Sequence, residues 1–398
     1  MGWALRVIGV GADGWDGVPH RLRHEIAAAD VVLGGARHLQ LIPDVAGQTR
    51  EPWPSPLRAG IGSVLDRHAG RRVVALASGD PLVSGIGSTL IELLGRDAVS
   101  VEPAVSSVAL ARARMGWPAE TVETISVVGR DVHAVLRWLA PGHRLIVLSS
   151  DSTTPATVAA LLTAAGYGDS ELTVLGDLGS SAETRASATA SSWTGPAPQL
   201  NVIAAQLVGH VRGSLLGGLP DDAFGPDGAF IGRDARAAAL VRLAPQPGQQ
   251  LWDVGAGSGS VAIEWLRAHP STRAAAVERR PDRADLISRN AERLGVPRLR
   301  VVEGSAPSAL AELPPPDAVF LGGGVVNQAV IDRCLAALGP GGRLVAQAST
   351  PAAEALLSDL CHLHGGELVR LTVETLTPSA VPAQGPATPS VTQWGYHR

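Results

Sequence analysis

Three glycines at alternate positions, directly after an apolar run, are the strongest chemical signal in this sequence. Residues 251–259 read Leu-Trp-Asp-Val-Gly-Ala-Gly-Ser-Gly, and an amphipathic stretch continues to Leu266. This pattern predicts a strand, a tight turn and a helix, because glycine permits positive φ and lets the backbone lie flat against a ligand. A second apolar run, 274–277, ends in Glu278, whose carboxylate can accept hydrogen bonds from both hydroxyls of a ribose.

The turn differs from the fingerprint of dinucleotide-binding proteins. That fingerprint needs its third glycine at position 260, where this chain has Ser260. With Asp253 before the turn and Glu278 after it, the pattern favours an S-adenosylmethionine enzyme over a nicotinamide oxidoreductase. The residues expected to hold the cofactor here are Gly255, Ala256, Gly257, Ser258, Gly259 and Glu278.

The N-terminal half has its own set of strand ends with small and polar residues. Apolar runs at 5–10, 73–77 and 99–101 lead into Gly-rich or Ser-rich turns, the second of them Ser78-Gly79-Asp80-Pro81. Three such ends predict a ligand crevice at the carboxyl edge of a sheet. The structural alternatives are an Asx-turn for Asp80 and helix capping for Ser106 and Ser107.

Composition limits the classes of function. All 33 basic residues are arginine, and the net charge of −4 argues against a nucleic-acid-binding protein. Without lysine, the chain has no Schiff-base or lysine general-base chemistry. Neither a signal peptide nor a membrane-spanning run is evident, so we expect a cytoplasmic protein with no membrane partner and with reduced thiols at Cys334 and Cys361.

The pattern of elements predicts two α/β domains, 1–210 and 229–398, joined by a Gly-, Pro- and Asp-rich linker at 211–228. In the second domain, strand and helix patterns alternate, which predicts a Rossmann-like parallel sheet covered on both faces. Its last two strands, 367–375 and 391–396, flank a Pro-rich loop at 377–389 and are expected to form an antiparallel hairpin. This is the seven-stranded architecture of class I methyltransferases. In the first domain, the strands expected beyond Val122 form a second lobe; they are 126–129, 145–149, 171–175, 184–190 and 200–207.

The whole chain resembles the fused, decarboxylating precorrin-6Y methyltransferases of the cobalamin pathway. Its first part is similar to tetrapyrrole methylases in Gly9–Gly14, Ser78–Pro81, Gly85–Gly87, Pro103–Ser107, Val128–Arg130 and Asn201–Ala204. Its second part is similar to the carbon-15 methylase and decarboxylase in Gly232–Arg236, Asp253–Ser260, Glu278, Gly304–Ala306, Gly322–Gly324, Pro340–Gly342 and Val391–Trp394. Single turns of this kind are weak signals, but their order and the fusion of two such domains are specific.

The resemblance implies S-adenosylmethionine-dependent methylation of carbon 5 by the first domain, and methylation of carbon 15 with loss of a ring acetate carboxyl by the second. It implies one cofactor in each domain and a small-molecule tetrapyrrole as substrate. It adds these cofactor-binding residues: Gly9, Gly11, Asp80, Ser84, Gly85, Ser106, Ser107, Gly232 and Ala306.

The second domain departs from the family at Ile231-Gly232-Arg233, where an Ile-Thr-Lys-type stretch is usual. Gly232 has no hydroxyl to offer, so only its backbone could contact the cofactor. Arg233, Asp234 and Arg236 are candidates for substrate contacts; the alternative is a solvated helix face with Asp234 as N-cap.

Several alternatives stay open. A methyltransferase for RNA or protein, a non-catalytic cofactor-binding regulator and a nicotinamide oxidoreductase are the rival classes. The sequence does not distinguish metal-free from cobalt-bearing substrate, fix the order of methylation or assign a catalytic acid. We expect a homo-oligomer, dimer or tetramer, and no metal site, with His362 and His364 as structural residues.

Overall fold

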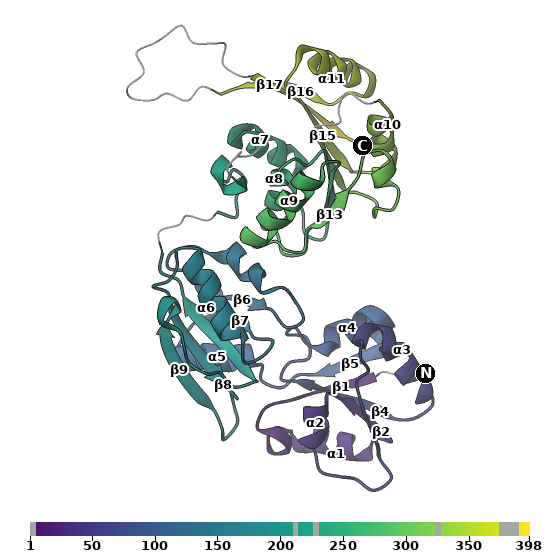
Figure 1. Cartoon of the computed structure of the whole chain (residues 1–398). Helices are drawn as coiled ribbons and strands as arrows, with labels where there is room; N and C mark the ends of the chain where they lie inside the picture. Colours follow the sequence, from purple (N-terminus) through teal and green to yellow (C-terminus); the bar gives the residue numbers. More distant parts are fainter. Residues whose placement is uncertain (1–4, 210–213, 226–230, 323–327, 374–389) are drawn as a thin grey trace. The chain divides into compact units, whose positions relative to one another are not determined.

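The computed structural model describes residues 5–209, 214–225, 231–322, 328–373 and 390–398. The chain divides into two compact units (Figure 1). The N-terminal unit comprises Met1–Val132 and Ala140–Val211, and the C-terminal unit comprises His133–Leu139 and Arg212–Arg398. Within the described ranges, no helix combines the length and the apolar character needed to cross a membrane.

The first sheet of the N-terminal unit is parallel, with strand order β3-β2-β4-β1-β5. Its strands are β1 (Leu5–Val10), β2 (Val31–Gly34), β3 (Thr49–Pro52), β4 (Val73–Ser78) and β5 (Val99–Glu102). The connecting helices are α1 (His20–Ala28), α2 (Ala36–Gln40), α3 (Leu57–Arg67) and α4 (Ile86–Leu94). Helix α1 packs on one face of the sheet, and α3 and α4 pack on the other. The carboxyl ends of β1, β4 and β5 therefore lie side by side, as the crevice expected from the sequence requires.

The second sheet of this unit is mixed, with strand order β6-β7-β10-β8-β9. Its strands are β6 (Glu123–Ser126), β7 (Arg144–Leu148), β8 (Glu171–Gly176), β9 (Thr184–Thr189) and β10 (Asn201–Gln206). Only the β6–β7 pair is parallel among these strands. Helix α5 (Ser107–Met115) packs on the sheet through Val108 and Ala111, and α6 (Thr154–Ala164) connects β7 to β8.

The described residues of the C-terminal unit form a seven-stranded sheet with order β13-β12-β11-β14-β15-β17-β16. Its strands are β11 (Gln250–Val254), β12 (Arg273–Glu278), β13 (Arg300–Glu303), β14 (Ala318–Leu321), β15 (Arg343–Ala348), β16 (Glu367–Thr372) and β17 (Ser390–His397). The first five strands run parallel, and β17 pairs antiparallel with both β15 and β16. This is the doubly wound sheet with a closing hairpin that the sequence predicts.

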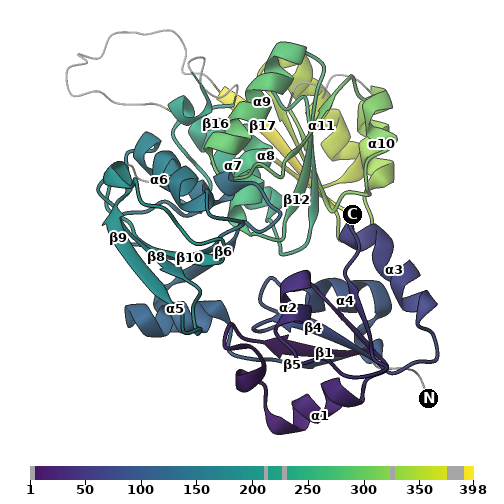
Figure 2. The same ribbon diagram turned by 60° about the horizontal axis from the view of Figure 1, so that its bottom comes forward.

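Helices cover both faces of this sheet (Figure 2). One apolar cluster joins α7 (Arg233–Leu243), α8 (Ser260–Ala268) and α9 (Pro281–Arg293) to one face. A second cluster joins α10 (Gln328–Ala337) and α11 (Pro351–His364) to the other. The β11–α8 turn that carries the three glycines thus lies at the carboxyl edge of the central strand. Short 3₁₀ helices complete both units: Gly14–Gly17, Arg96–Ala98, Ala119–Thr121, Val132–Trp138, Ala190–Ser192, Asp221–Phe224 and Ser308–Leu310.

Three details differ from the sequence prediction. Strands β2 and β3 were not predicted, and the strand predicted at 126–129 ends at Ser126. Part of the segment predicted as a linker, 211–228, packs against the core, because Leu219 and Phe224 are buried in the apolar cluster under α7 and α8. Residues 211–213, 226–228, 323–324 and 374–389, which include the Pro-rich loop and part of the Gly322–Gly324 motif, lie outside the described residues.

Candidate active sites in the two units

A cavity of about 590 Å³ opens between the two sheets of the N-terminal unit. Its lining comes from the ends of β1, β2, β4 and β7, from β10, and from the segments that lead into α4 and α5. Apolar side chains alternate with glycines and serines along this lining. A volume within the range of about 300–1,000 Å³, lined mostly by apolar groups with a few polar ones, is typical of small-molecule sites.

Six of the predicted residues line this cavity together: Gly11, Asp80, Ser84, Gly85, Ser106 and Ser107. They come from three strand ends that are distant in sequence, and the parallel register of β1 with β4 and β5 brings them together. Ser84 has a φ of 53°, a left-handed conformation that is uncommon outside glycine. The crevice predicted from the sequence is therefore present in the structure.

Asp80 and Ser106 make the local contacts that the structural alternatives predict. Oδ1 of Asp80 accepts a hydrogen bond from the Leu82 amide at 2.8 Å, which is an Asx-turn. Oγ of Ser106 accepts from the Ala109 amide at 3.1 Å and caps α5. Both side chains also line the cavity. Since each of these oxygens accepts one local bond, the turns hold the side chains rigid without using all of their polar capacity.

Gly9 has a different position from the other predicted residues and is not among those that line the cavity. A Cβ at this position would lie 1.9 Å from the Gly79 carbonyl oxygen and 2.6 Å from the Ala104 amide nitrogen. The glycine therefore allows β1 to pack directly against the two turns that follow β4 and β5. The structure gives Gly9 a packing role, and its contact with the cofactor stays a prediction.

Several polar residues of the cavity were not predicted. Ser149, Ser150 and Gln199 are three of them, and Arg37 and His38 lie on α2 directly after β2. Nε2 of His38 lies 2.8 Å from Oγ of Ser78, and Nη2 of Arg37 lies 3.2 Å from both of these atoms. Burial, together with the adjacent Arg37 charge, lowers the pKa of His38 to about 4, so its imidazole is neutral near pH 7. The available signal was the apolar run Val31–Leu33 followed by two glycines, a strand end like the other three.

In the C-terminal unit, the turn after β11 has the predicted conformation. Gly255, Gly257 and Gly259 have φ values of 73°, 62° and 77°, which L side chains rarely adopt. Glu278, at the carboxyl end of the neighbouring strand β12, is 4% exposed. Its Oε2 accepts a hydrogen bond from the Gly257 amide at 2.9 Å, and its Oε1 accepts from the Arg280 amide at 3.1 Å. The two predicted elements of the site, the glycine turn and the carboxylate, are thus in direct contact.

Asp253 lies beneath the turn and is fully buried. Its Oδ2 accepts from the Ala262 amide at 3.0 Å, whereas Oδ1 has no hydrogen-bond partner among the described residues. Burial raises the pKa of Asp253 to about 7, and the nearby Glu278 charge adds to this effect. Oγ of Ser258 is also buried without a partner in the described part of the chain.

The remaining predicted cofactor residues of this unit are Ala256, Ala306 and Gly232, which lie in separate segments of the chain. Ala256 is half-buried against the cluster under α8, and Ala306 is half-buried on the opposite face of the sheet. Gly232 is exposed and is the residue before α7, where it makes no side-chain cap.

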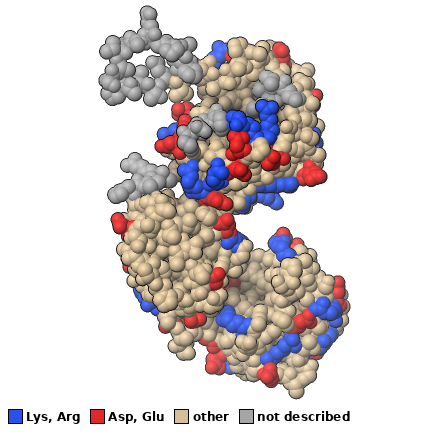
Figure 3. All heavy atoms as spheres, viewed as in Figure 1, with Lys and Arg blue, Asp and Glu red and all other residues tan. Residues whose placement is uncertain are grey.

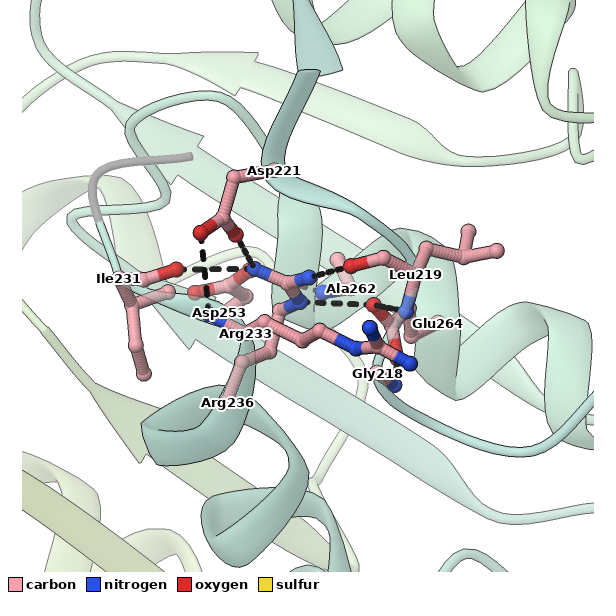
Figure 4. A network of polar contacts seen from close by, with 9 residues as sticks. All are labelled: Gly218, Leu219, Asp221, Ile231, Arg233, Arg236, Asp253, Ala262 and Glu264. Atoms are coloured by element: carbon pink, nitrogen blue, oxygen red, sulfur yellow. Dashed lines mark hydrogen bonds and ion pairs between the residues drawn. The ribbon is translucent and has the colours of Figure 1, made fainter. Parts of the chain in front are cut away.

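The predicted substrate residues at the start of α7 separate into two groups. Arg233 and Asp234 are exposed, and Asp234 is not the N-cap, because α7 begins at Arg233 and Gly232 is its N-cap. The Arg233 amide donates to Oδ2 of Asp221 at 3.2 Å. Arg236 is fully buried, and Figure 4 shows it at the centre of a polar network. The prediction that Arg236 contacts substrate is wrong.

The contacts of Arg236 explain this correction. Its Nε donates to Glu264 at 2.7 Å, and its Nη1 donates to Asp221 at 2.9 Å and to the Ile231 carbonyl at 2.8 Å. Its Nη2 donates to the Leu219 carbonyl, and the guanidinium stacks 4.7 Å from the Phe224 ring centroid. Glu264 in turn accepts from the Gly218 and Leu219 amides. Arg236 therefore fixes residues 218–224 against α7 and α8, with four of its five N–H groups bonded within the protein and the side chain closed off from solvent.

In the part of the chain that the structure describes, no group of three or more His, Cys, Asp or Glu residues could hold a metal ion. His362 makes a hydrogen bond with the Ser358 carbonyl at 2.7 Å, and His364 packs near Trp394 and Tyr396. On the face seen in Figure 3, arginines are interspersed with acidic residues and do not form an extended basic tract.

The residues present fit S-adenosylmethionine in both units. In the N-terminal unit, the cavity offers Asp80, Ser84 and Ser106 beside exposed backbone at Gly11 and Gly85. In the C-terminal unit, the orphaned buried oxygens of Asp253 and Ser258 lie at the glycine turn, and each Glu278 oxygen retains capacity for a further donor.

Two family models match successive parts of the chain. Residues 4–193 match the tetrapyrrole (corrin/porphyrin) methylases, and residues 222–398 match the precorrin methyltransferase domain. A precorrin-6Y C(5,15)-methyltransferase [decarboxylating] from Sinorhizobium sp. is 41% identical over 397 residues, which are 98% of this chain and 96% of the relative. One from Mycobacterium tuberculosis (strain CDC 1551 / Oshkosh) is 44% identical over 368 residues, 92% of each chain.

A solved structure adds a further likeness. The C-terminal domain of precorrin-6Y C5,15-methyltransferase from Rhodobacter capsulatus is 43% identical, with a TM-score of 0.43, over 46% of this chain and all of that domain. Because the curated relatives extend over nearly the full length of the sequence, the chain belongs to the family of decarboxylating precorrin-6Y C(5,15)-methyltransferases.

Proposed function

We propose that this chain is a bifunctional S-adenosylmethionine-dependent methyltransferase of cobalamin biosynthesis. It methylates carbons 5 and 15 of precorrin-6Y and removes the carboxyl group of a ring acetate, to give precorrin-8X. The observation that carries this proposal is the presence, in one chain, of two strand-end sites of the kind that the family's two activities need. The near full-length likeness to enzymes of that name supports it.

The two activities are divided between the units. The N-terminal unit methylates carbon 5 in the cavity between its two sheets, with Gly11, Asp80, Ser84, Ser106 and Ser107 beside one cofactor. The C-terminal unit methylates carbon 15 and decarboxylates at the β11–α8 turn, beside a second cofactor. The separate family matches of residues 4–193 and 222–398 support this division.

The chemistry asks the protein mainly for alignment and for exclusion of water. When bound, S-adenosylmethionine supplies an electrophilic methyl group on a sulfonium. The enamine-like carbons of a reduced tetrapyrrole are already nucleophilic, so a strong protein base is not required. The glycine turns let the backbone approach the ligand closely, and buried Asp253 and Glu278 fix the turn of the C-terminal unit through the Ala262 and Gly257 amides. Decarboxylation also needs an electron sink, which a protonated ring imine of the substrate provides.

The full chain with S-adenosylmethionine and either a metal-free or a cobalt-bearing precursor tests this function by mass spectrometry. The expected product carries two additional methyl groups and has lost carbon dioxide. Calorimetry with S-adenosylhomocysteine is expected to show two sites per chain. Binding at a single site, or transfer of one methyl group without decarboxylation, would contradict the proposal.

We also propose a cytoplasmic homo-oligomer, dimer or tetramer, with no nucleic-acid partner. Light scattering of the purified chain tests its oligomeric state, and a mass equal to one chain would contradict this part. An unchanged cofactor isotherm in the presence of added RNA is the result expected if nucleic acid has no role.

A further inference from the structure

The cavity of the N-terminal unit is nearly free of charge. Among the described residues that line it, Arg37 is the one lysine or arginine and Asp80 the one carboxylate. They lie on different elements, Arg37 on α2 after β2 and Asp80 in the turn after β4. A cationic group that shares its cavity with a single carboxylate, on a different element, is expected to select an anionic part of its ligand.

Most donors of Arg37 are unused. A guanidinium has five N–H groups, and in the described residues hydrogen bonds are made by Nη2 alone, to Ser78 Oγ and His38 Nε2 at 3.2 Å each. No carboxylate within the described ranges forms an ion pair with it, although Asp177 is close enough to act on its charge. Burial lowers the pKa of Arg37, yet a guanidinium remains protonated near neutral pH.

His38 and Ser78 fix the orientation of this side chain. When Nη2 of Arg37 donates to Nε2 of His38, Nε2 carries no proton and the imidazole is the neutral Nδ1–H tautomer. Ser78 Oγ, 2.8 Å from the same nitrogen, closes a triangle of polar atoms at the end of β4. A guanidinium held at one nitrogen in this way presents its other donors in a fixed fork, which matches the geometry of a carboxylate.

We propose that Arg37, positioned by His38 and Ser78, binds a side-chain carboxylate of the tetrapyrrole in the N-terminal cavity. This assignment rests on the proposed function, in which this unit methylates carbon 5. S-adenosylmethionine also has a carboxylate, but an ammonium group lies beside it. The predicted cofactor residues follow β1, β4 and β5, whereas Arg37 follows β2 and reaches the end of β4 through Ser78. The tetrapyrrole is the ligand with several peripheral carboxylates and no compensating ammonium beside each one.

Arg37→Gln in the full chain tests this inference, with Arg72→Gln as the matched control. Arg72 is an exposed arginine of the same unit that pairs with Asp30 and does not line the cavity. Methyl transfer at carbons 5 and 15 is scored separately by NMR with ¹³C-methyl S-adenosylmethionine, and S-adenosylhomocysteine affinity is measured by calorimetry. Because a charge-assisted fork is lost, we expect Arg37→Gln to raise KM for carbon-5 methylation about tenfold or more. Cofactor affinity, carbon-15 transfer and the Arg72→Gln enzyme are expected to stay unchanged.

Two substitutions of His38, one that retains a hydrogen-bond acceptor and one that does not, test whether this residue positions Arg37. His38→Gln retains an acceptor near the place of Nε2 and is expected to keep KM near that of the parent, whereas His38→Leu is expected to raise KM several-fold with kcat largely retained. A substrate with its peripheral carboxylates esterified is expected to show the same KM with the parent and with Arg37→Gln.

The other outcomes overturn the inference, and they distinguish it from the function on which it rests. Unchanged KM at both carbons removes the role of Arg37 and leaves the proposed function standing. A loss of S-adenosylhomocysteine affinity equal to the rise in KM assigns Arg37 to the cofactor instead. A selective effect on carbon 15 refutes both the inference and the division of activities between the units.

Discussion

Replacement of Arg236 by methionine tests a structural role against substrate binding, because this arginine is fully buried and makes four hydrogen bonds within the protein. The change removes the ion pair with Glu264, whose side chain is 2% exposed, and the bond to Asp221, which is 43% exposed. It also leaves the Ile231 and Leu219 carbonyls without this donor. Breaking a buried ion pair by removing one partner costs about 3–5 kcal/mol.

Hydrogen exchange of the full chain measures this cost within the C-terminal unit, where a global unfolding curve of two units would mix their transitions. With 1.36 kcal/mol per factor of ten, the loss corresponds to roughly a hundredfold to several-thousandfold faster exchange of the slowest amides in α7 and α8. Arg242→Met on the same helix is the control. Arg242 pairs with Glu367, which is 65% exposed, so its loss is expected to cost less than about 1 kcal/mol.

A double variant adds a second check. Glu264→Leu together with Arg236→Met removes both buried charges, but the Gly218 and Leu219 amides then lose their acceptor. We therefore expect only partial recovery of amide protection. Protection within threefold of the parent in Arg236→Met, combined with a raised KM for the tetrapyrrole, would refute the structural assignment and restore the substrate contact.

Three further predictions concern the C-terminal site. Glu278→Gln is expected to weaken S-adenosylhomocysteine binding about five- to thirtyfold at one of two calorimetric sites, since the variant loses roughly 1–2 kcal/mol of charge assistance; an unchanged isotherm would remove Glu278 from the site. Gly257→Val introduces a β-branched side chain at a φ of 62°, so mass spectrometry is expected to show one added methyl group and no decarboxylation. Full decarboxylation by this variant would refute the division of labour. The pKa of Asp253 rises from 3.8 to about 7 on folding, so between these values the unfolded state binds fewer protons than the folded state. Stability of the C-terminal unit is therefore expected to fall as pH rises through this window in urea titrations, and Asp253→Asn is expected to flatten the fall.

The sequence predicted most of the fold because hydrophobic periodicity is strong where a parallel sheet is buried on both faces. Strand β14 is a continuous apolar run, and β11 is apolar apart from Gln250 and Asp253. Both strands end in glycine turns, and this pattern appears directly in the sequence. Strand β3 was missed because its four residues, Thr-Arg-Glu-Pro, are polar and lie at the edge of the sheet. Nothing in so short and polar a run distinguishes an edge strand from a loop.

The glycine turns could be predicted as sites from the sequence, but the residues that they contact could not. A turn that needs positive φ is visible in the residue type, as at Gly255, whereas the contact between the Gly257 amide and Glu278 depends on the register of β11 against β12. Gly9 shows the limit of this reasoning, since a glycine that admits a ligand and one that admits a neighbouring backbone have the same sequence signature.

The roles of charged residues were harder to predict, because the sequence does not show whether a charged side chain is paired within the protein or available to a ligand. Arg233 and Arg236 lie three positions apart on α7, yet one is exposed and the other is buried among four acceptors supplied by Asp221, Glu264 and two carbonyls. The reverse holds for Arg37, which carried no motif but lies in the cavity with most of its donors unpaired. A guanidinium is available to a ligand only when the protein leaves its donors unsatisfied, and that property depends on tertiary contacts far apart in sequence. In this chain, the unsatisfied donors make Arg37 the candidate for a ligand contact, whereas Arg236 is bonded within the protein. The sequence motifs had indicated Arg236 and not Arg37.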